Sequence, residues 1–304
     1  MPRLADVITV LERLFPPDLA EAWDAVGLVC GDPDAQVRRV LFAVDPVAVV
    51  GDEAIEAGAD LVVTHHPLFL RPVNSVAATS PKGRLVHRLI THGVSLYVAH
   101  TNADKAAPGV NDALADALGL ENLRPLVPHQ AGDGATPAGP AGQAGQSAPA
   151  AQVGLGRIGV LPAAEPLSVF TRRVANRLPP TVHGVRASGD PDAMVRTVAV
   201  CGGAGDSLLD TVRAAGVDAF VTADLRHHPS SEAGETGGPA LVDVAHWASE
   251  WLWLAPAAER LVEGLSQRGT TVETHISATP TDPWTLHESA RETGASAADE
   301  GSSL

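Results

Sequence analysis

Short runs of β-branched and aliphatic residues alternate with stretches of helical period along most of the chain. This alternation constrains the fold more than any other feature, because it is the pattern of strands and helices in α/β proteins. Six runs are expected to be strands: 40–44, 60–64, 95–99, 197–200, 218–222 and 241–245. The expected helices are 47–57, 83–92, 110–118 and 207–214, followed by a long helical stretch at 246–265. The sequence therefore predicts an α/β fold.

A low-complexity run divides this pattern in two. Residues 129–152 are almost entirely Ala, Gly, Pro and Gln, a composition that cannot form a packed core and is typical of a flexible linker or surface insertion. The expected division is an N-terminal α/β half at 1–126, a linker at 127–152, a C-terminal α/β half at 153–284 and a disordered tail at 285–304. Residues 57–67 and 215–229 resemble each other, which indicates either an internal repeat or the chance similarity common between α/β units.

The composition excludes several classes of protein. Hydrophobic residues make up 45% of the 304, which favours a globular fold over a disordered chain. The formal net charge is −15 and Lys and Arg do not cluster, so a nucleic-acid partner is not expected. No uncharged run is long enough to cross a bilayer, and the first residues favour an amphipathic helix over a signal peptide. Two cysteines, Cys30 and Cys201, favour a reducing cytoplasm over a disulfide framework.

Three pairs of histidines and acids directly follow expected strand ends. The pairs are His65 with His66, His100 with Asp104, and His246 with Glu250. Because ligands of α/β sheets bind beyond the carboxyl ends of the strands, the fold is expected to bring the pairs to one rim, in the cleft between the halves. Each pair alone has a plainer interpretation, as a strand cap or as an i,i+4 pair on a helix surface. Their shared position at strand ends favours a common metal site.

The donor atoms of these pairs suit two divalent metal ions. Imidazole nitrogens and carboxylate oxygens bind Zn, Fe, Mn, Co, Ni or Mg, and the number of donors exceeds what one tetrahedral ion needs. Two ions about 3.5–4 Å apart, bridged by a carboxylate and a water, use such a set. A pair of this kind lowers the pKa of the bridging water and polarises a carbonyl or phosphoryl oxygen.

Further motifs carry weaker signals. The run CGGAG at 201–205 follows a strand and precedes a helix, so it is expected to form a tight turn, with anion binding through its N–H groups as the alternative. Its glycines do not have the spacing of the dinucleotide fingerprint. His227 and His228 are expected to lie in the cleft without binding metal, and both cysteines are expected to be small hydrophobic residues and not nucleophiles. Trp23 and Asp24 form a polar-aromatic element to which no mechanism can be attached.

Taken together, these segments resemble those of a known family. The motifs LAEAWDAVGLVCGDP, THHPLF, LYVAHTNAD, GVNDALADALGL, GLGRIG, CGGAG, VTADLRHH and HWASE occur here in one order. On these motifs the chain is similar to the dinuclear metal-centre family of GTP cyclohydrolase 1 type 2 homologues, also described as YbgI-like or NIF-three-like. The resemblance covers residues 3–284 apart from the low-complexity run.

The resemblance implies two α/β halves, a ring-shaped homohexamer built as a trimer of dimers, and a two-metal site. The metal ligands it implies are His65, His66, Asp104, His246 and Glu250, with His100 beside them as a ligand, a second-shell residue or a proton shuttle. It also implies a metal-dependent hydrolase that opens the guanine ring of GTP. The alternatives are a phosphoester or nucleotide hydrolase, and a non-enzymatic hexameric metal-binding or interaction scaffold.

Overall fold

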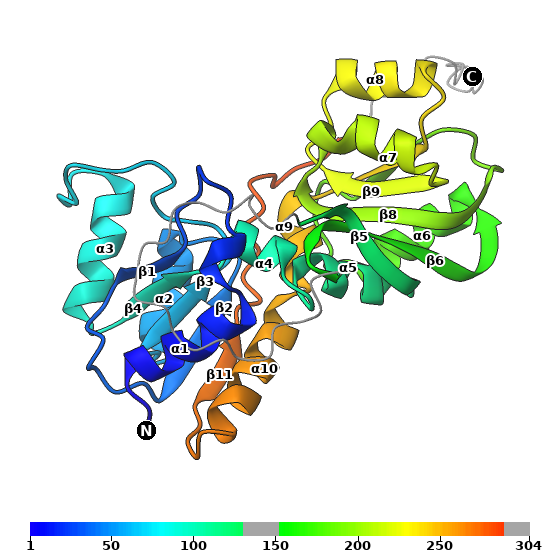
Figure 1. Cartoon of the computed structure of the whole chain (residues 1–304). Coiled ribbons are helices and arrows are strands. Elements are labelled where there is room, and N and C mark those ends of the chain that lie inside the picture. Colours follow the sequence, from blue (N-terminus) through cyan, green and yellow to red (C-terminus); the bar gives the residue numbers. More distant parts are fainter. Residues whose placement is uncertain (130–151, 289–304) are drawn as a thin grey trace, which may run out of the picture.

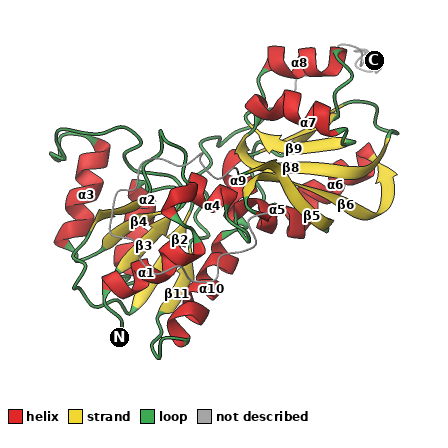
Figure 2. Ribbon diagram, in the orientation of Figure 1, coloured by secondary structure: helices red, strands yellow, loops and turns green. Residues whose placement is uncertain are grey.

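Two sheets with helices on both faces lie side by side along the long axis of the molecule (Figure 1). The computed structural model describes residues 1–129 and 152–288. The linker expected at 127–152 and the tail expected at 285–304 therefore fall almost wholly outside the described residues. Figure 2 shows the mixed content of helices and strands in both parts, which confirms the α/β class predicted from the sequence.

The first sheet has the strand order β1-β4-β3-β2-β11. Its strands are β1 (Gly27–Cys30), β2 (Arg39–Ala43), β3 (Leu61–Thr64), β4 (Ser95–Val98) and β11 (Glu273–Ile276), and its helices are α1 (Leu4–Leu14), α2 (Ala48–Glu56), α3 (Pro81–Thr91) and α10 (Leu254–Ser266). Only β1 runs antiparallel to its neighbour. Side chains alternate along a strand, so Leu41 packs in a cluster with α2 and α3 while Phe42 packs in one with α1 and α10. Covered on both faces, β2, β3 and β4 are almost continuously apolar.

The second sheet has the order β5-β6-β8-β9-β10-β7. Its strands are β5 (Glu121–Pro128), β6 (Gly154–Pro166), β7 (Val185–Ser188), β8 (Met194–Ala204), β9 (Ala219–Ala223) and β10 (Ala240–Val244). The remaining helices are α4 (Thr101–Lys105), α5 (Val110–Leu118), α6 (Leu167–Arg177), α7 (Leu209–Ala215), α8 (His227–Glu235) and α9 (His246–Trp251). All six expected strands are present, whereas the long helical stretch expected at 246–265 is divided into α9 and α10.

Each part of the sequence contributes an edge strand to the sheet of the other. Strand β5, which precedes the low-complexity run, pairs with β6 in the second sheet, and β11 returns from the end of the chain to pair with β2 in the first. One hydrophobic cluster also runs through both parts, from Leu4 in α1 to Val221 in β9. The sheets thus do not coincide with the expected halves at 1–126 and 153–284, because the chain crosses between them twice, before β5 and before β11.

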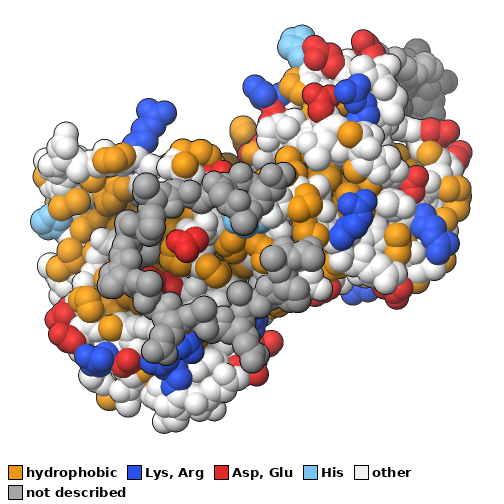
Figure 3. All heavy atoms as spheres, in the orientation of Figure 1, with side chains coloured by type: hydrophobic (Ala, Val, Ile, Leu, Met, Phe, Trp, Pro, Cys, Tyr) orange, Lys and Arg blue, Asp and Glu red, His pale blue; other side chains and the backbone are white. Residues whose placement is uncertain are grey.

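The surface carries no sign of a basic patch on the face shown in Figure 3, where Lys and Arg side chains are scattered among acidic and apolar ones.

Within residues 1–129 and 152–288, every helix is too short or too polar to traverse a bilayer.

A buried arginine joins the two parts. Arg157 of β6 is 1% exposed, and its guanidinium donates to both carboxylate oxygens of Asp112 in α5, at 2.9 and 2.7 Å. It also donates to the carbonyl oxygens of Ala106, Gly154 and Gly156. Because the planar guanidinium is fully satisfied, this ion pair fixes the loop after α4 and the start of α5 against the second sheet.

We expect Arg157→Ala to lower the free energy of unfolding by about 3–5 kcal/mol, because it removes a buried guanidinium that pairs with Asp112 and is the donor to three carbonyl oxygens. The control is Arg173→Ala, which removes a similar bidentate pair with Glu165 where the arginine side chain is 35% exposed. That change should cost no more than about 1 kcal/mol. Urea denaturation of both variants measures the difference, and equal losses would contradict a special role for Arg157.

Candidate metal centre

The register of the parallel strands brings the first three histidines to one edge. Thr64, the last residue of β3, pairs with Val98, the last residue of β4. His65 therefore emerges beside His100, and the backbone N–H groups of His65 and His66 still donate to the carbonyl oxygens at the end of β2 and just beyond it. Helix α4 begins directly after His100 and places Asp104 at the same edge.

The second sheet also places side chains just beyond the ends of two paired parallel strands. Val244 of β10 pairs with Ala223 of β9, so that Asp224 and His246 emerge together beyond the strand ends. Helix α9 starts at His246, and Glu250 lies one turn further on the same face. In Figure 1, α9 and α4 lie between the two sheets, where the chain passes from one to the other.

All six residues predicted from the sequence converge at this junction. The Glu250 carboxylate oxygens lie 3.0 Å from His246 Nε2, 3.1 Å from His66 Nε2 and 3.4 Å from His65 Nε2. Asp104 Oδ1 lies 3.6 Å from His65 Nε2, and the His100 ring centre lies 5.1 Å from that of His65. Glu250 and His65 are only 3% and 1% exposed, whereas the side chains of His66 and His246 are 22% and 32% exposed, so the cluster is buried on one side and open to solvent on the other.

An oxygen acceptor holds the Nδ1 atom of every histidine in the cluster. The distances from Nδ1 to oxygen are 2.7–3.0 Å, for the pairs His65 with the carbonyl of Ala99, His66 with Asp45, His100 with Asp24, and His246 with Asp224. Carbonyl and carboxylate oxygens can only accept, so each Nδ1–H donates. In the neutral rings this leaves a lone pair on every Nε2, which is the arrangement that carboxylates impose on histidine ligands of metals.

The converging lone pairs fit a cation. His66 Nε2 and His246 Nε2 lie 3.2 Å apart, and neutral rings held through Nδ1 cannot share a proton there. His65 Nε2 and Asp104 Oδ1 are buried without a hydrogen-bond partner among the described residues. Such orphaned buried atoms are costly, and a metal ion bound between them would satisfy both. The residues present therefore fit the divalent ions expected from the sequence.

The pKa values of several acids and histidines in the cluster are also shifted. Burial and the neighbouring Glu250 raise the pKa of Asp104 to about 7. Burial would also raise the pKa of Glu250, but the surrounding imidazoles of His66, His65 and His246 lower it well below its usual value. For His246, burial opposes the charged form, yet Glu250 and Asp224 raise its pKa to about 9. The carboxylates thus favour positive charge within the cluster, which imidazolium rings or a divalent cation can supply.

Two overlapping groups of side chains could each hold an ion. One consists of His65, His66 and His100, and the other of His66, His246 and Glu250; in each, the donor atoms lie within 4.8 Å of one another. His66 belongs to both. His100, which sequence reasoning left open between ligand and neighbour, is thus placed among the candidate ligands.

Glycines allow the end of β8 to pass close to the cluster. Gly203 has φ +68°, and a Cβ added there would lie 2.5 Å from Glu250 Oε1 and 3.2 Å from His246 Nε2. The Gly203 N–H donates to Ser249 of α9. The run at 201–205 was expected to form a turn, but residues 201–204 continue β8, and the turn follows them. Gly203 is needed for close packing against the cluster, whereas Gly205 allows close packing against Thr222.

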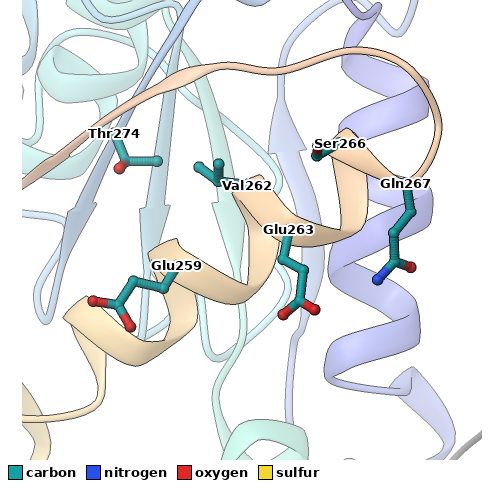
Figure 4. A pocket seen from close by; sticks show the side chains of 6 residues that line it. All are labelled: Glu259, Val262, Glu263, Ser266, Gln267 and Thr274. Carbon is teal, nitrogen blue, oxygen red and sulfur yellow. The ribbon is translucent and has the colours of Figure 1, made fainter.

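Other candidates lie outside the cluster. His227 and His228 begin α8 with their rings 5.1 Å apart, and His227 lines a different hollow, beside Arg186 and Asp243. Cys201 is buried and burial raises the pKa of its thiol, which agrees with a hydrophobic role. A further hollow of about 650 Å³ lies between α10 and β11, and its lining residues are two glutamates, two hydroxyl residues, a valine and a glutamine (Figure 4).

Sequence reasoning missed the acids behind the histidines. Asp45 and Asp224 each follow a strand end by one or two residues, which was the signal that identified the histidines themselves. Asp24 was noticed without a mechanism, and the structure supplies one: it orients His100 and is itself held by Thr101.

Known proteins are similar to this one in sequence and in fold. A profile of the Duf34/NIF3 (NGG1p interacting factor 3) family matches residues 2–283. The chain belongs to this family. The resemblance noted in the sequence is thereby confirmed.

Among curated Duf34/NIF3 relatives, a protein of Streptomyces coelicolor named GTP cyclohydrolase 1 type 2 homolog is 55% identical, covering 94% of this chain and 95% of its own. A Mycobacterium tuberculosis protein of the same name is 44% identical, covering 95% and 99%. Among solved structures, a Bacillus cereus protein related to NIF3 superposes with a TM-score of 0.82 at 28% identity, covering 94% and 99% of the two chains. A Staphylococcus aureus protein, SA1388, gives 0.81 at 28% identity, with the same coverage.

We expect Gly203→Ala to reduce bound metal sharply, because its new Cβ would displace Glu250 and His246. The matched control is Gly216→Ala, at a similar φ of +66° but with no atom within 4 Å of the added Cβ. Both variants carry the left-handed backbone penalty of about 1–2 kcal/mol, and Gly203→Ala should lose more thermal stability than the control because Glu250 must also shift. Elemental analysis should show metal loss only for Gly203→Ala, and unchanged metal in that variant would refute the close-approach argument.

Proposed function

We propose that this protein is a metal-dependent hydrolase with two divalent ions held by His65, His66, Asp104, His246 and Glu250. The observation that carries the proposal is the convergence of four Nε2 lone pairs and two buried carboxylates on one small volume. Zn, Fe, Mn, Co, Ni and Mg remain candidates, because imidazole and carboxylate donors accept all of them. Glu250 offers one carboxylate oxygen 3.4 Å from His65 Nε2 and the other 3.1 Å from His66 Nε2, whereas His66 has a single lone pair and would bind one ion.

The substrate we propose is GTP, opened at the imidazole ring of guanine. The names of the Streptomyces and Mycobacterium relatives support this choice. Addition of one water at C8 with cleavage of the ring gives a formamide, and a second water releases C8 as formate. The same site would also suit a phosphoester or another nucleotide, because fold and family do not fix the substrate.

When bound, the ions would lower the pKa of a bridging water and polarise the oxygen or nitrogen acceptor of the substrate. The protein's own groups have separate tasks. Asp45 and Asp224 hold the imidazoles of His66 and His246 in the tautomer that presents Nε2. His100, with a side chain 15% exposed and Nδ1 fixed by Asp24, would bind metal or transfer a proton at Nε2.

The second candidate is a hexameric metal-binding or interaction scaffold without catalytic activity. The family description, which names an interacting factor, supports it. In both candidates the assembly we propose is the homohexamer that the sequence resemblance implies.

Replacement of both His65 and His66 by Ala should remove bound metal and lower any GTP turnover by about 100-fold or more, since loss of residues behind metal ligands already costs 10–100-fold. The matched control is the other adjacent pair, His227 and His228, whose double Ala variant should keep its metal. Elemental analysis after chelator-free purification and formate release with each metal give the two readouts.

Metal retained in the His65/His66 variant, or absent from the wild-type protein, would refute the ligand assignment. A metal-loaded wild-type protein that turns over neither GTP nor any phosphoester would refute the hydrolase and leave the scaffold.

A further inference from the structure

An exposed tryptophan stands directly beside the candidate metal centre. Trp23 is 59% exposed, whereas Trp247 and Trp253 are buried in the shared core. Its ring centre lies 6.0 Å from that of His100, with the ring planes at 76°. The His100 ring in turn lies 5.1 and 5.6 Å from the rings of His65 and His66. The indole is therefore the next aromatic ring outward from the cluster, with most of its surface open to solvent.

The backbone that carries this indole is tightly held. The neighbouring Asp24 has a fully buried side chain and accepts hydrogen bonds from His100 Nδ1, from the N–H and hydroxyl groups of Thr101, and from Ala25 N–H. The same carboxylate thus orients His100 and anchors Trp23. An indole has few rotatable bonds, so its exposed surface is presented to a ligand at little cost in conformational entropy.

Stacking on a planar ring is the use that best fits such a surface. Nucleobases stack on aromatic side chains with about 1–3 kcal/mol per base, whatever the base, because each has a π-face. We infer that Trp23 is the wall against which the planar heteroaromatic ring of a purine nucleotide stacks while the rest of the ligand meets the metal centre. This inference rests on the proposed function and narrows its substrate class to molecules that contain such a ring.

The test is equilibrium binding to the full, metal-loaded protein by calorimetry. Three probes separate the parts of the ligand: GTP, guanosine and inorganic triphosphate. Trp23→Ala should weaken binding of GTP and guanosine by about 5- to 100-fold, the range that stacking energies imply, and leave triphosphate binding unchanged. Trp23→Phe should retain most of the affinity, because a smaller aromatic ring still stacks. Metal content should be the same in all three proteins.

Three outcomes would overturn the inference. They are equal GTP affinity in Trp23→Ala and wild type, wild-type protein that binds neither GTP nor guanosine, and a change of oligomeric state in Trp23→Ala, which would make the indole a contact between copies of the chain. Failure of the proposed reaction is separately visible. Binding that depends on Trp23 without formate release would retain the stacking wall and reject GTP ring opening.

Discussion

The organisation of this protein depends on the close approach of imidazole and carboxylate side chains at one point. Four imidazoles, each fixed through Nδ1, present Nε2 toward two buried carboxylates, and three further carboxylates lie behind the rings. In water such a group of lone pairs and negative charges would separate. The surrounding fold holds it together, and the most direct explanation for that cost is the cations we propose to bind there.

The candidate metal centre lies at the junction between the two sheets, here called the seam, and contacts across this junction hold it rigid. Neither sheet contains the whole cluster: His65, His66 and Asp104 come from the first, and His246 and Glu250 follow the second. The seam is held by the exchange of β5 and β11, by a common hydrophobic cluster and by the buried Arg157. Glycine at position 203 lets β8 approach α9 without displacing Glu250. The precision of the cluster is therefore a property of the junction and not of either half alone.

The chemistry of the donors and the identity of the ligand are separate questions. The cluster offers imidazole nitrogens and carboxylate oxygens, which are donors that could hold a metal ion. The substrate depends instead on the residues around the cluster. Among them, Trp23 offers a surface on which a planar ring can stack, and the aspartate next to it in the chain also orients His100. One carboxylate thereby links the candidate metal site to the proposed recognition of a ring.

The sequence alone determined the α/β class, the six strands β2, β3, β4, β8, β9 and β10, and the six residues of the cluster. An apolar run indicates a strand that is buried on both faces, and a histidine just after such a run lies at the carboxyl edge of the sheet. Both features can be recognised from neighbouring residues in the sequence. Five strands were missed. Strands β1, β7 and β11 are short and only partly buried, whereas β5 and β6 flank the low-complexity run, where no strand was expected. Only the tertiary structure decided which histidines Asp45 and Asp224 hold, the exchange of edge strands, and the position of Trp23 beside His100. Each depends on strand register and on contacts between residues far apart in the chain, which no local pattern encodes.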